Sequence, residues 1–492
     1  MNDELPIHNN YNRHESFHEP RKLTNGRRLK KRSLKLNKKS TIALNMNLKP
    51  IHKESAYDYD INDTNLLNVF YSELSLKEEE IELANSLNEA KYKDPDEYQE
   101  NEDGIKCASV IQLVLILTDP NSDIFFQKQF LCCFSCFTNT KLLLALLLTR
   151  FFANEKQVES EELLEHIRNR IIRILIKWIK ISASQFTENM ICVLNKFLLV
   201  LEEPDQTQEN QSILYLNLKD GLDILTNKKQ ISYPTKSLLP PILPECDEEN
   251  IKSIQNYDPE EVARQLTLIH INIFKKIEPD ELLKGIWNVS QETKIQHINE
   301  LIDIFNKFSS YVSISVLYGE SSKKRAETFN YWINVACKFE AIKNYHGLFS
   351  VIFGLQHVSV TRLSKTIKEV MKNTESKENF ERLSTICDFG NDFKTYRKII
   401  SDIKGSCVPF IGCFQKDLIY IQETYPNTIN GLINFKKCEA CYSLLKSILD
   451  FQSSEFNFEV VPKLLNFIEE LPEPAENTDM MKLSLSKEKK SK

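Results

Sequence analysis

Long apolar stretches whose residues repeat every three to four positions run through most of the chain and constrain its fold more than any other feature. This spacing places apolar side chains along one side of a helix, whereas a half-buried strand needs strict alternation, and no competing series of alternating segments is present. Glycine is scarce, with 11 in 492 residues. We therefore predict an all-α protein, and a chain of this length favours roughly three folded units over a single core.

Charge is distributed unevenly along the N-terminal part of the chain. Residues 1–50 contain 12 Lys and Arg against 4 Asp and Glu, whereas residues 51–104 contain 4 against 16. The basic run RRLKKRSLKLNKK has too few clustered apolar residues to offset the entropy of ordering, so we expect a disordered arm. Such an arm can be a solvated tail, a nuclear address or a contact for an anionic membrane surface, and the sequence leaves all three open.

The cysteines and the apolar runs bear on the compartment. The first ten residues are polar and lack the apolar centre of a signal peptide, so the 12 cysteines are expected to be free thiols in a reducing compartment. A membrane-spanning helix needs about 20 apolar residues. The best runs, such as residues 142–148, are much shorter. We expect a cytoplasmic protein, with recruitment to a membrane through the basic arm as an option.

The helical pattern, the prolines and the charge together divide the chain into six segments. We expect a disordered basic and acidic region (1–64), an acidic amphipathic helix with a linker (65–102), a first helical domain (103–205), a linker with a proline-rich strap (206–257), a second helical domain (258–475) and a disordered basic tail (476–492). Among the expected helices are 65–88, 107–117, 124–137, 360–373, 377–403, 414–424, 435–451 and 459–470.

The usual signatures of bond-making chemistry are absent from this sequence. It contains no phosphate-binding G-x-x-x-x-G-K-[ST] loop, no H-E-x-x-H and no G-x-S-x-G. Two C-x-x-C pairs, Cys133/Cys136 and Cys438/Cys441, lie in predicted helices without a nearby third or fourth ligand, so we interpret them as core thiols and expect no metal. His346 and His357 lack a partnered nucleophile or carboxylate and are interpreted as ordinary histidines. Basic residues of the folded part alternate with acids, which argues against nucleic-acid binding.

The segment VPFIGCFQKDLIYIQETYPN (408–427) predicts a short helix with two different faces. On a helical wheel Leu418 and Ile421 fall within about 40° of Phe414, whereas Ile419 and Glu423 lie at roughly 140° and 180° from it. One face therefore belongs to the core, and the other presents an apolar side chain beside a carboxylate. A second helix at 435–451 completes a helical hairpin. Periodicity alone leaves open that Ile419 only packs against this second helix.

Six segments, in this order and spacing, resemble the catalytic domain of Ras-type guanine-nucleotide exchange factors. They are DPEEVARQLTLIHINIFKKIEPDELLKGIW (258–287), IFNKFSSYV (304–312), WINVACKFEAIKNYHGLFSVIFGL (332–355), VTRLSKT (360–366), VPFIGCFQKDL (408–418) and LINFKKC (432–438). Upstream, DGIKCASVIQLVLILTD (103–119), FLCCFSCFTNTKLLLALLLTRF (130–151) and IRILIKWIK (172–180) resemble the Ras exchanger motif that commonly precedes that domain. The resemblance covers residues 103–205 and 258–475.

The resemblance implies a bowl-shaped helical catalytic domain that binds a Ras-family small GTPase and inserts a protruding helical hairpin between its two switch segments. Ile419 and Glu423 match the hairpin positions that face the magnesium and phosphate site, so GDP is expelled without covalent chemistry and without a cofactor. Family positions that contact the switch region or support the hairpin match seven further residues: Arg264, Asn344, Gln356, Arg362, Thr366, Phe410 and Asn434. For Arg264 a purely structural role is equally open.

Several departures from the family pattern bear on the partner rather than on the fold. Gln356 stands where Asn is usual, Tyr311 where Trp is common and Ile367 where Trp often follows, and Cys438-Glu439 interrupts a basic run. These departures leave an alternative open, in which the protein binds a GTPase as a scaffold or effector without exchange activity. A helical scaffold with no GTPase partner is a third hypothesis.

Overall fold

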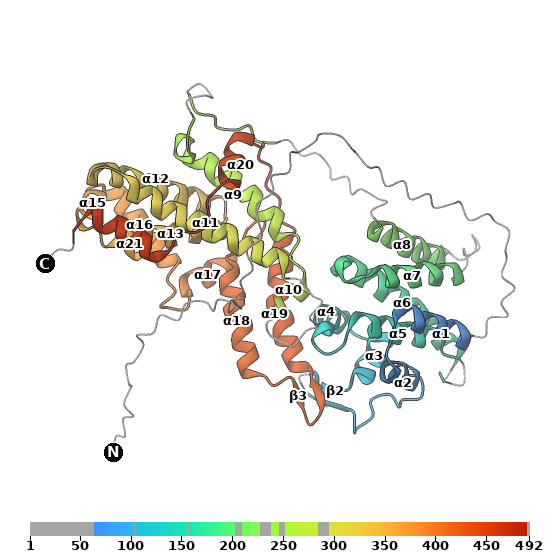
Figure 1. Cartoon of the computed structure of the whole chain (residues 1–492). Helices are drawn as coiled ribbons and strands as arrows, with labels where there is room; N and C mark the ends of the chain where they lie inside the picture. The colour runs from blue at the N-terminus through green and yellow to red at the C-terminus, as the bar shows by residue number, and fades with distance from the viewer. Residues whose placement is uncertain are drawn as a thin grey trace, which may run out of the picture. The chain divides into compact units, whose positions relative to one another are not determined.

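The computed structural model describes residues 63–489 apart from 103, 155–156, 159, 202–208, 227–237, 246–250 and 284–294. These residues belong to one compact unit, Ile61–Lys492, and the expected basic arm (1–50) lies outside them. The unit is mostly helical, which confirms the predicted fold class (Figure 1). Within the described part of the chain, no helix has the length and apolarity needed to cross a bilayer.

The N-terminal helices begin where side chains can accept hydrogen bonds from free backbone N–H groups. Ser109, Asp123, Asn139, Ser160 and Thr187 each cap a helix in this way. The elements are α1 (Asp63–Leu74), α2 (Glu78–Ser86), β1 (Tyr98–Asn101), β2 (Gly104–Ala108), α3 (Val110–Thr118), α4 (Ile124–Cys133), the 3-10 turn η1 (Phe134–Cys136), α5 (Thr140–Phe151), α6 (Glu161–Ile181), the 3-10 turn η2 (Ala183–Gln185), α7 (Glu188–Val200) and α8 (Glu209–Leu225).

The catalytic-domain resemblance falls on a longer series of helices that opens as predicted, with Asp258 capping a helix whose first residue is Pro259. The elements are the 3-10 turn η4 (Ile254–Asn256), α9 (Pro259–Phe274), α10 (Pro279–Leu283), α11 (Gln296–Tyr318), α12 (Ser322–Ala341), α13 (Tyr345–Gln356), α14 (Val358–Thr361), α15 (Ser364–Val370), α16 (Thr374–Ile386), α17 (Lys394–Asp402), α18 (Ile411–Thr424), β3 (Thr428–Ile429), β4 (Leu432–Asn434), α19 (Phe435–Gln452), α20 (Pro462–Glu469) and α21 (Asn477–Lys487).

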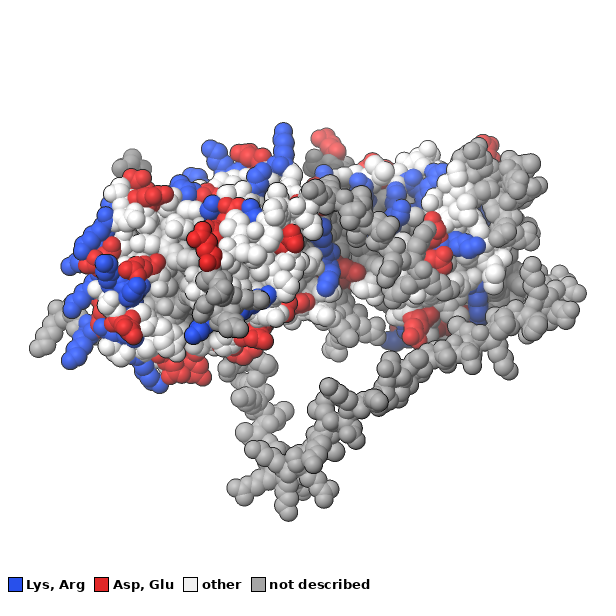
Figure 2. Space-filling view, turned by 90° about the horizontal axis from the view of Figure 1, so that it is seen from above, with Lys and Arg blue, Asp and Glu red and all other residues white. Residues whose placement is uncertain are grey.

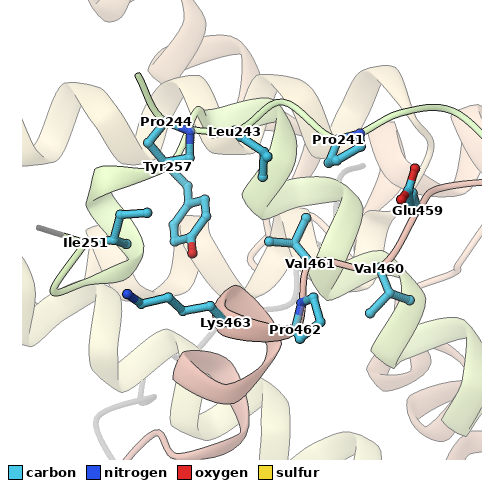
Figure 3. A pocket seen from close by; sticks show the side chains of 10 residues that line it. All are labelled: Pro241, Leu243, Pro244, Ile251, Tyr257, Glu459, Val460, Val461, Pro462 and Lys463. Atoms are coloured by element: carbon cyan, nitrogen blue, oxygen red, sulfur yellow. The ribbon is translucent and has the colours of Figure 1, made fainter. Parts of the chain in front are cut away.

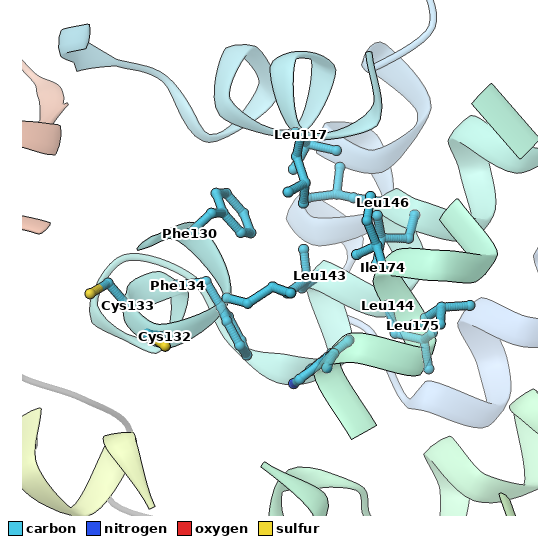
Figure 4. Packing of buried hydrophobic residues seen from close by; sticks show 14 of the residues in the cluster. Leu117, Phe130, Cys132, Cys133, Phe134, Leu143, Leu144, Leu146, Ile174 and Leu175 are labelled. Atoms are coloured by element: carbon cyan, nitrogen blue, oxygen red, sulfur yellow. The ribbon is translucent and has the colours of Figure 1, made fainter. Parts of the chain in front are cut away.

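Two hydrophobic cores hold these helices together. The first is built by the N-terminal helices, with Leu117, Phe130, Leu143 and Ile174 meeting from four different helices (Figure 4). It extends to the inner faces of α18 and α19. The second core joins α9, α11, α12 and α13 and includes fully buried Trp332. The helical hairpin therefore shares its apolar core with the N-terminal helices rather than with the larger domain alone.

A four-stranded sheet of very short strands, ordered β1-β2-β4-β3, was not predicted from the sequence. β2 pairs antiparallel with β4, so that Cys107 lies opposite Asn434 and Ala108 opposite Ile433. β3 and β4 form the turn between α18 and α19. The N-terminal part of the chain is thereby hydrogen-bonded to the far end of the helical hairpin.

Several expected segments differ from the structure. The expected helix 65–88 is two helices, 107–117 begins as β2, 360–373 is α14 and α15, 377–403 is α16 and α17, and the expected linker 206–257 contains α8. The expectation that the tail 476–492 is disordered was wrong for residues 477–487, which form α21. In α21, Met480 and Ser484 are buried, and Glu488 just beyond it forms an ion pair with Arg325 at 3.0 Å.

The proline strap runs along the second domain in extended form. Leu239 N donates to Asn457 O at 2.8 Å, and Glu459 N donates to Leu239 O at 3.1 Å. Together with residues 459–463 the strap borders an open groove of about 440 Å³, into which Leu243, Tyr257 and Val461 project (Figure 3). Among the described residues on the face shown in Figure 2, basic and acidic side chains are interspersed and form no continuous patch of one sign.

Candidate functional site

The first hairpin helix, α18, separates its side chains into a buried and an exposed face. Phe414, Leu418 and Ile421 are at most 8% exposed, whereas Ile419 is 58% exposed. Glu423 lies on the same outer face and is exposed as well. The exposure predicted from the helical wheel is confirmed. More than half of the Ile419 side chain is therefore left uncovered by the second helix and the rest of the chain.

Tyr420 is a third member of this outer face that the sequence analysis missed. Its side chain is 66% exposed, and it lies beside Ile419 and one turn before Glu423. The helical wheel carried the signal, because a residue six positions after Phe414 falls about 240° from the core direction. We call Ile419, Tyr420 and Glu423 the lever face.

The base of the hairpin is hydrogen-bonded to the loop before α13. Val408 N donates to Lys343 O at 3.0 Å, and Tyr345 N donates to Val408 O at 2.8 Å. Asn344, between them, is fully buried, accepts a hydrogen bond from Gly347 N at 2.9 Å and donates to Thr267 Oγ1 at 2.8 Å. Asn344 therefore holds the loop that carries the hairpin base and has no exposed surface to offer a partner.

Phe410 lies immediately before α18 and is packed among aromatic rings. Its ring stacks on that of Phe349 at a centroid distance of 4.1 Å, and its backbone N–H donates to the Tyr396 hydroxyl at 2.8 Å. Gly412 leaves room for this ring, since a Cβ there would lie 2.6 Å from Phe410 Cζ. With 8% exposure, Phe410 anchors the start of the helix within the domain.

The far end of the hairpin is closed by two polar side chains. Asn434 Nδ2 donates to Pro426 O at 2.8 Å, and its backbone N–H donates to Asn427 O at 3.0 Å. Lys437 Nζ, on α19, donates to Asn427 Oδ1 at 2.7 Å and to Gln422 Oε1 at 3.0 Å. Burial lowers the pKa of the Lys437 ammonium. Both residues fix the turn against α18.

The second hairpin helix, α19, packs on α4 of the N-terminal part. The Phe126 and Phe435 rings lie 5.1 Å apart, and Cys133 Sγ donates to Cys438 O at 3.5 Å. The two C-x-x-C pairs thus meet at this contact, which their separation in sequence concealed. The thiols are free, and burial raises the pKa of Cys133. Among the described residues, no group of three or more His, Cys, Asp or Glu could hold a metal ion.

Arg264 makes several contacts within the chain. It donates to Pro240 O at 3.2 Å, forms an ion pair with Glu260 and lies over the Phe458 ring at 5.5 Å. Its side chain is 14% exposed. These contacts connect α9 with the proline strap, as the structural interpretation of Arg264 expects.

The positions carried over from V-T-R-L-S-K-T lie against α21. Arg362 donates to Ser484 Oγ at 2.8 Å and to Glu488 O at 2.9 Å. Thr366 is fully buried; its hydroxyl donates to Glu488 Oε1 at 2.8 Å and accepts from Arg325 Nε at 2.8 Å. Burial alone would raise the pKa of Glu488, but hydrogen bonds from these neighbours lower it.

Gln356, the last residue of α13, is exposed and separate from these networks. Of the nine predicted site residues, Ile419, Glu423 and Gln356 present free surface. Three belong to the support of the hairpin, and three are bound elsewhere within the chain. The supporting residues are Asn344, Phe410 and Asn434, and the others are Arg264, Arg362 and Thr366.

The two histidines singled out in the sequence have different surroundings. His346 is buried at the start of α13, where its Nε2 contacts Leu301 O at 3.2 Å. Its ring lies 4.9 Å from that of buried His270 and 6.1 Å from that of Phe410. Burial lowers the pKa of His346 to about 4, so the ring is neutral at pH 7. His357 contacts Ser359 Oγ and Asn477 Oδ1.

Taken together, these features define a helical protein with an exposed lever face on a hairpin that is fixed at its base, its turn and its inner side. Two family models match the chain: the RasGEF domain at residues 261–439 and the RasGEF N-terminal motif at residues 104–199. The chain therefore contains a RasGEF N-terminal motif followed by a RasGEF domain.

Curated relatives agree with this assignment. Ras guanine nucleotide exchange factor I of Dictyostelium discoideum is 28% identical over 375 residues, which cover 74% of this chain and 44% of that protein. Factor J of the same organism is 27% identical over 80% of this chain and 49% of its own length. Mouse Ras-specific guanine nucleotide-releasing factor RalGPS2 is 34% identical over 46% of this chain and 40% of its own. This chain therefore spans about half the length of these relatives or less.

Proposed function

We propose that this protein is a guanine-nucleotide exchange factor that promotes GDP release from a Ras-family small GTPase. The observation that carries the proposal is the exposed lever face on α18, within a chain that has both RasGEF regions. A large apolar side chain exposed beside a carboxylate, on a helix otherwise packed into a core, is suited to a partner with its own apolar and ionic features.

The lever face acts on the partner through two different side chains. Ile419 brings hydrocarbon to the place where the GTPase holds its magnesium ion, and a hard cation there needs oxygen ligands that hydrocarbon does not supply. Glu423 brings a carboxylate towards the phosphates, which repels them and competes for the positive groups that bind them. Both effects weaken nucleotide binding, and neither forms or breaks a covalent bond.

Exchange by this route is a matter of differential binding. The factor binds the nucleotide-free GTPase more tightly than the loaded one, so the affinity of the GTPase for GDP falls by the same factor. GTP then refills the empty site and displaces the factor. Release is accelerated without a cofactor, and the factor is not an enzyme of covalent chemistry.

The N-terminal motif supports the hairpin in this proposal. The β2–β4 pairing and the contact of α4 with α19 connect it to the turn and to the inner helix. The N-terminal residues named here are not part of the lever face. Their proposed role is therefore to hold the hairpin in place rather than to act on the nucleotide site. The predicted segments 103–205 and 258–475 remain our proposal for the two domains.

The test is release of fluorescent GDP from a panel of Ras-family GTPases. Acceleration with at least one member supports the proposal. Binding without acceleration supports the alternative of a GTPase-binding scaffold or effector. That alternative is open because Gln356 stands where Asn is usual in the family. Absence of binding to every member of a full panel contradicts both.

We also propose that the basic arm of residues 1–50 binds an anionic membrane surface. Its 12 Lys and Arg against 4 acids favour attraction to acidic lipids at low salt. Deletion of residues 1–50 is expected to reduce sedimentation with vesicles that contain phosphatidylserine, with neutral vesicles as the control. Equal sedimentation of the full-length and the truncated protein would show that the arm does not bind the membrane surface.

A further inference from the structure

The outer flank of α18 is held by α17 and by the loop that precedes it. Arg397, on α17, donates to both carboxylate oxygens of Asp417, on α18, with each N–O distance 2.7 Å. A guanidinium and a carboxylate paired through two parallel hydrogen bonds have a fixed relative orientation, unlike a single surface ion pair. The contact therefore restrains the direction of α18 as well as its distance from α17. Figure 1 shows the two helices as neighbours.

A second connection between the same elements starts from Asp392. Its carboxylate forms ion pairs with Lys416 on α18 and with Arg397 on α17. Lys416 Nζ also lies 5.0 Å from the centre of the Phe389 ring and 5.8 Å from that of Phe393. The loop thus binds Lys416, and α17 binds its neighbour Asp417. Only Leu418 separates these two residues from Ile419, the first residue of the lever face.

The backbone of this loop is held in an unfavourable conformation. Asp392 and Phe393 both have positive φ, at 50° and 54°, although neither is glycine. Two successive left-handed residues of this kind persist only where surrounding contacts determine them. Here Arg397 Nε donates to Asp392 O at 2.9 Å, and Phe393 N donates to Asp388 O at 3.1 Å. The strain is placed where it directs the Asp392 carboxylate towards α18.

We propose that Arg397 and Asp392 are positioning residues that set the tilt of α18 for nucleotide release. We call Asp392, Arg397, Lys416 and Asp417 the flank latch. This inference rests on the proposed exchange function. Glu423 lies thirteen residues beyond Phe410, about 20 Å along the helix axis, so a tilt of about 10° at the base would move its carboxylate by roughly 3 Å. Displacements of this size strongly reduce reactions that depend on position.

The flank latch differs from the other supports of the hairpin. The base, the turn and the inner face hold α18 from inside the domain and through the N-terminal motif, whereas the latch holds it from the outer flank. It also differs from the lever face, because its polar groups are bound within the chain. Loss of the latch should therefore affect the rate of release at saturation more than the stability of the protein.

The experiment compares Arg397→Gln with Arg382→Gln in the full chain. Arg382 forms an ion pair of similar exposure with Glu340, between α16 and α12, away from α18. The first readout is amide hydrogen exchange of the α18 peptide in the protein alone, and the second is the saturating rate of GDP release. Arg397→Gln should speed exchange in α18 about 10-fold and lower the saturating release rate about 10-fold. Arg382→Gln should change neither.

A charge-swapped protein, with Arg397→Asp and Asp417→Arg, controls for misfolding of the single variant. It should recover at least part of the protection of α18 from hydrogen exchange and part of the release rate. Unchanged release and unchanged α18 exchange in Arg397→Gln would overturn the proposal, as would faster α18 exchange with a wild-type release rate. If the wild-type chain releases GDP from no GTPase, the proposed function fails; the hydrogen-exchange comparison then still decides whether the latch holds α18.

Discussion

The buried His346 ring gives a prediction about acid stability. Its pKa is lowered from 6.5 to about 4 because burial penalises the charged form. Burial likewise lowers the pKa of its neighbour His270, with His346 itself as a further cause. The unfolded chain therefore binds protons more readily than the folded one between about pH 6.5 and 4. Stability is fully present above pH 6.5 and falls as the pH is lowered through this interval.

The size of this loss follows from the pKa difference. A difference of about 2.5 pKa units for His346 corresponds to about 3 kcal/mol between pH 7 and pH 4. This is a substantial part of the 5–15 kcal/mol by which folded domains are usually stable. Because the His346 ring lies 6.1 Å from the Phe410 ring, the loss should fall on the part of the domain that holds the base of the hairpin.

The assay is urea unfolding at a series of pH values for the wild type and for His346→Gln. A glutamine amide can still donate to Leu301 O but does not titrate, so the fall in unfolding free energy between pH 7 and 4 should be about 3 kcal/mol smaller. His357→Gln, outside the aromatic cluster, controls for the loss of an imidazole. Equal pH dependence of His346→Gln and the wild type would refute the assignment of the acid loss to this ring.

Three further changes test other parts of the molecule. Ile419→Ala combined with Glu423→Ala should reduce GDP release about 100-fold or more without shifting the thermal midpoint, since both side chains are exposed; wild-type release by this variant would refute the lever face. Gly412→Ala should lower the free energy of unfolding, measured with urea, by roughly 1–3 kcal/mol, because the added Cβ would clash with the Phe410 ring. An unchanged free energy would show that the ring can move aside. Glu488→Ala should lower the free energy of unfolding by about 3–5 kcal/mol, because it leaves buried Arg325 without its ion pair. Calorimetry measures this loss, and an unchanged unfolding transition would show that α21 does not stabilise the domain.

The lever face could be predicted from sequence because helical periodicity is a local property. Once Phe414, Leu418 and Ile421 are assigned to the core, the directions of Ile419 and Glu423 follow from 100° per residue. The same periodicity identified most of the long helices. The resemblance connected an exposed isoleucine and glutamate with a nucleotide-binding partner. Helical periodicity predicts that the two side chains are exposed but not what they bind.

Features fixed by contacts between distant segments could not be predicted in this way. α21 is attached by polar contacts such as the Glu488–Arg325 pair, 163 residues apart, so its sequence has the polar, basic composition of a disordered tail. Strands β3 and β4, of 2 and 3 residues, are too short to show alternation. The carried-over contacts Arg362 and Thr366 lie against α21, which was itself unforeseen.

The restraints on the hairpin bear on how release is driven. Its base is tied to the Asn344 loop, its turn belongs to a sheet with β2, its inner face shares a core with the N-terminal helices, and its flank is bound by Arg397. A hairpin restrained at four places is expected to move little when its lever face contacts a partner. Under the proposed exchange function, deformation on binding would then occur mainly in the GTPase, whose switch segments are expected to separate. The free energy of that deformation would supply the differential binding that exchange requires.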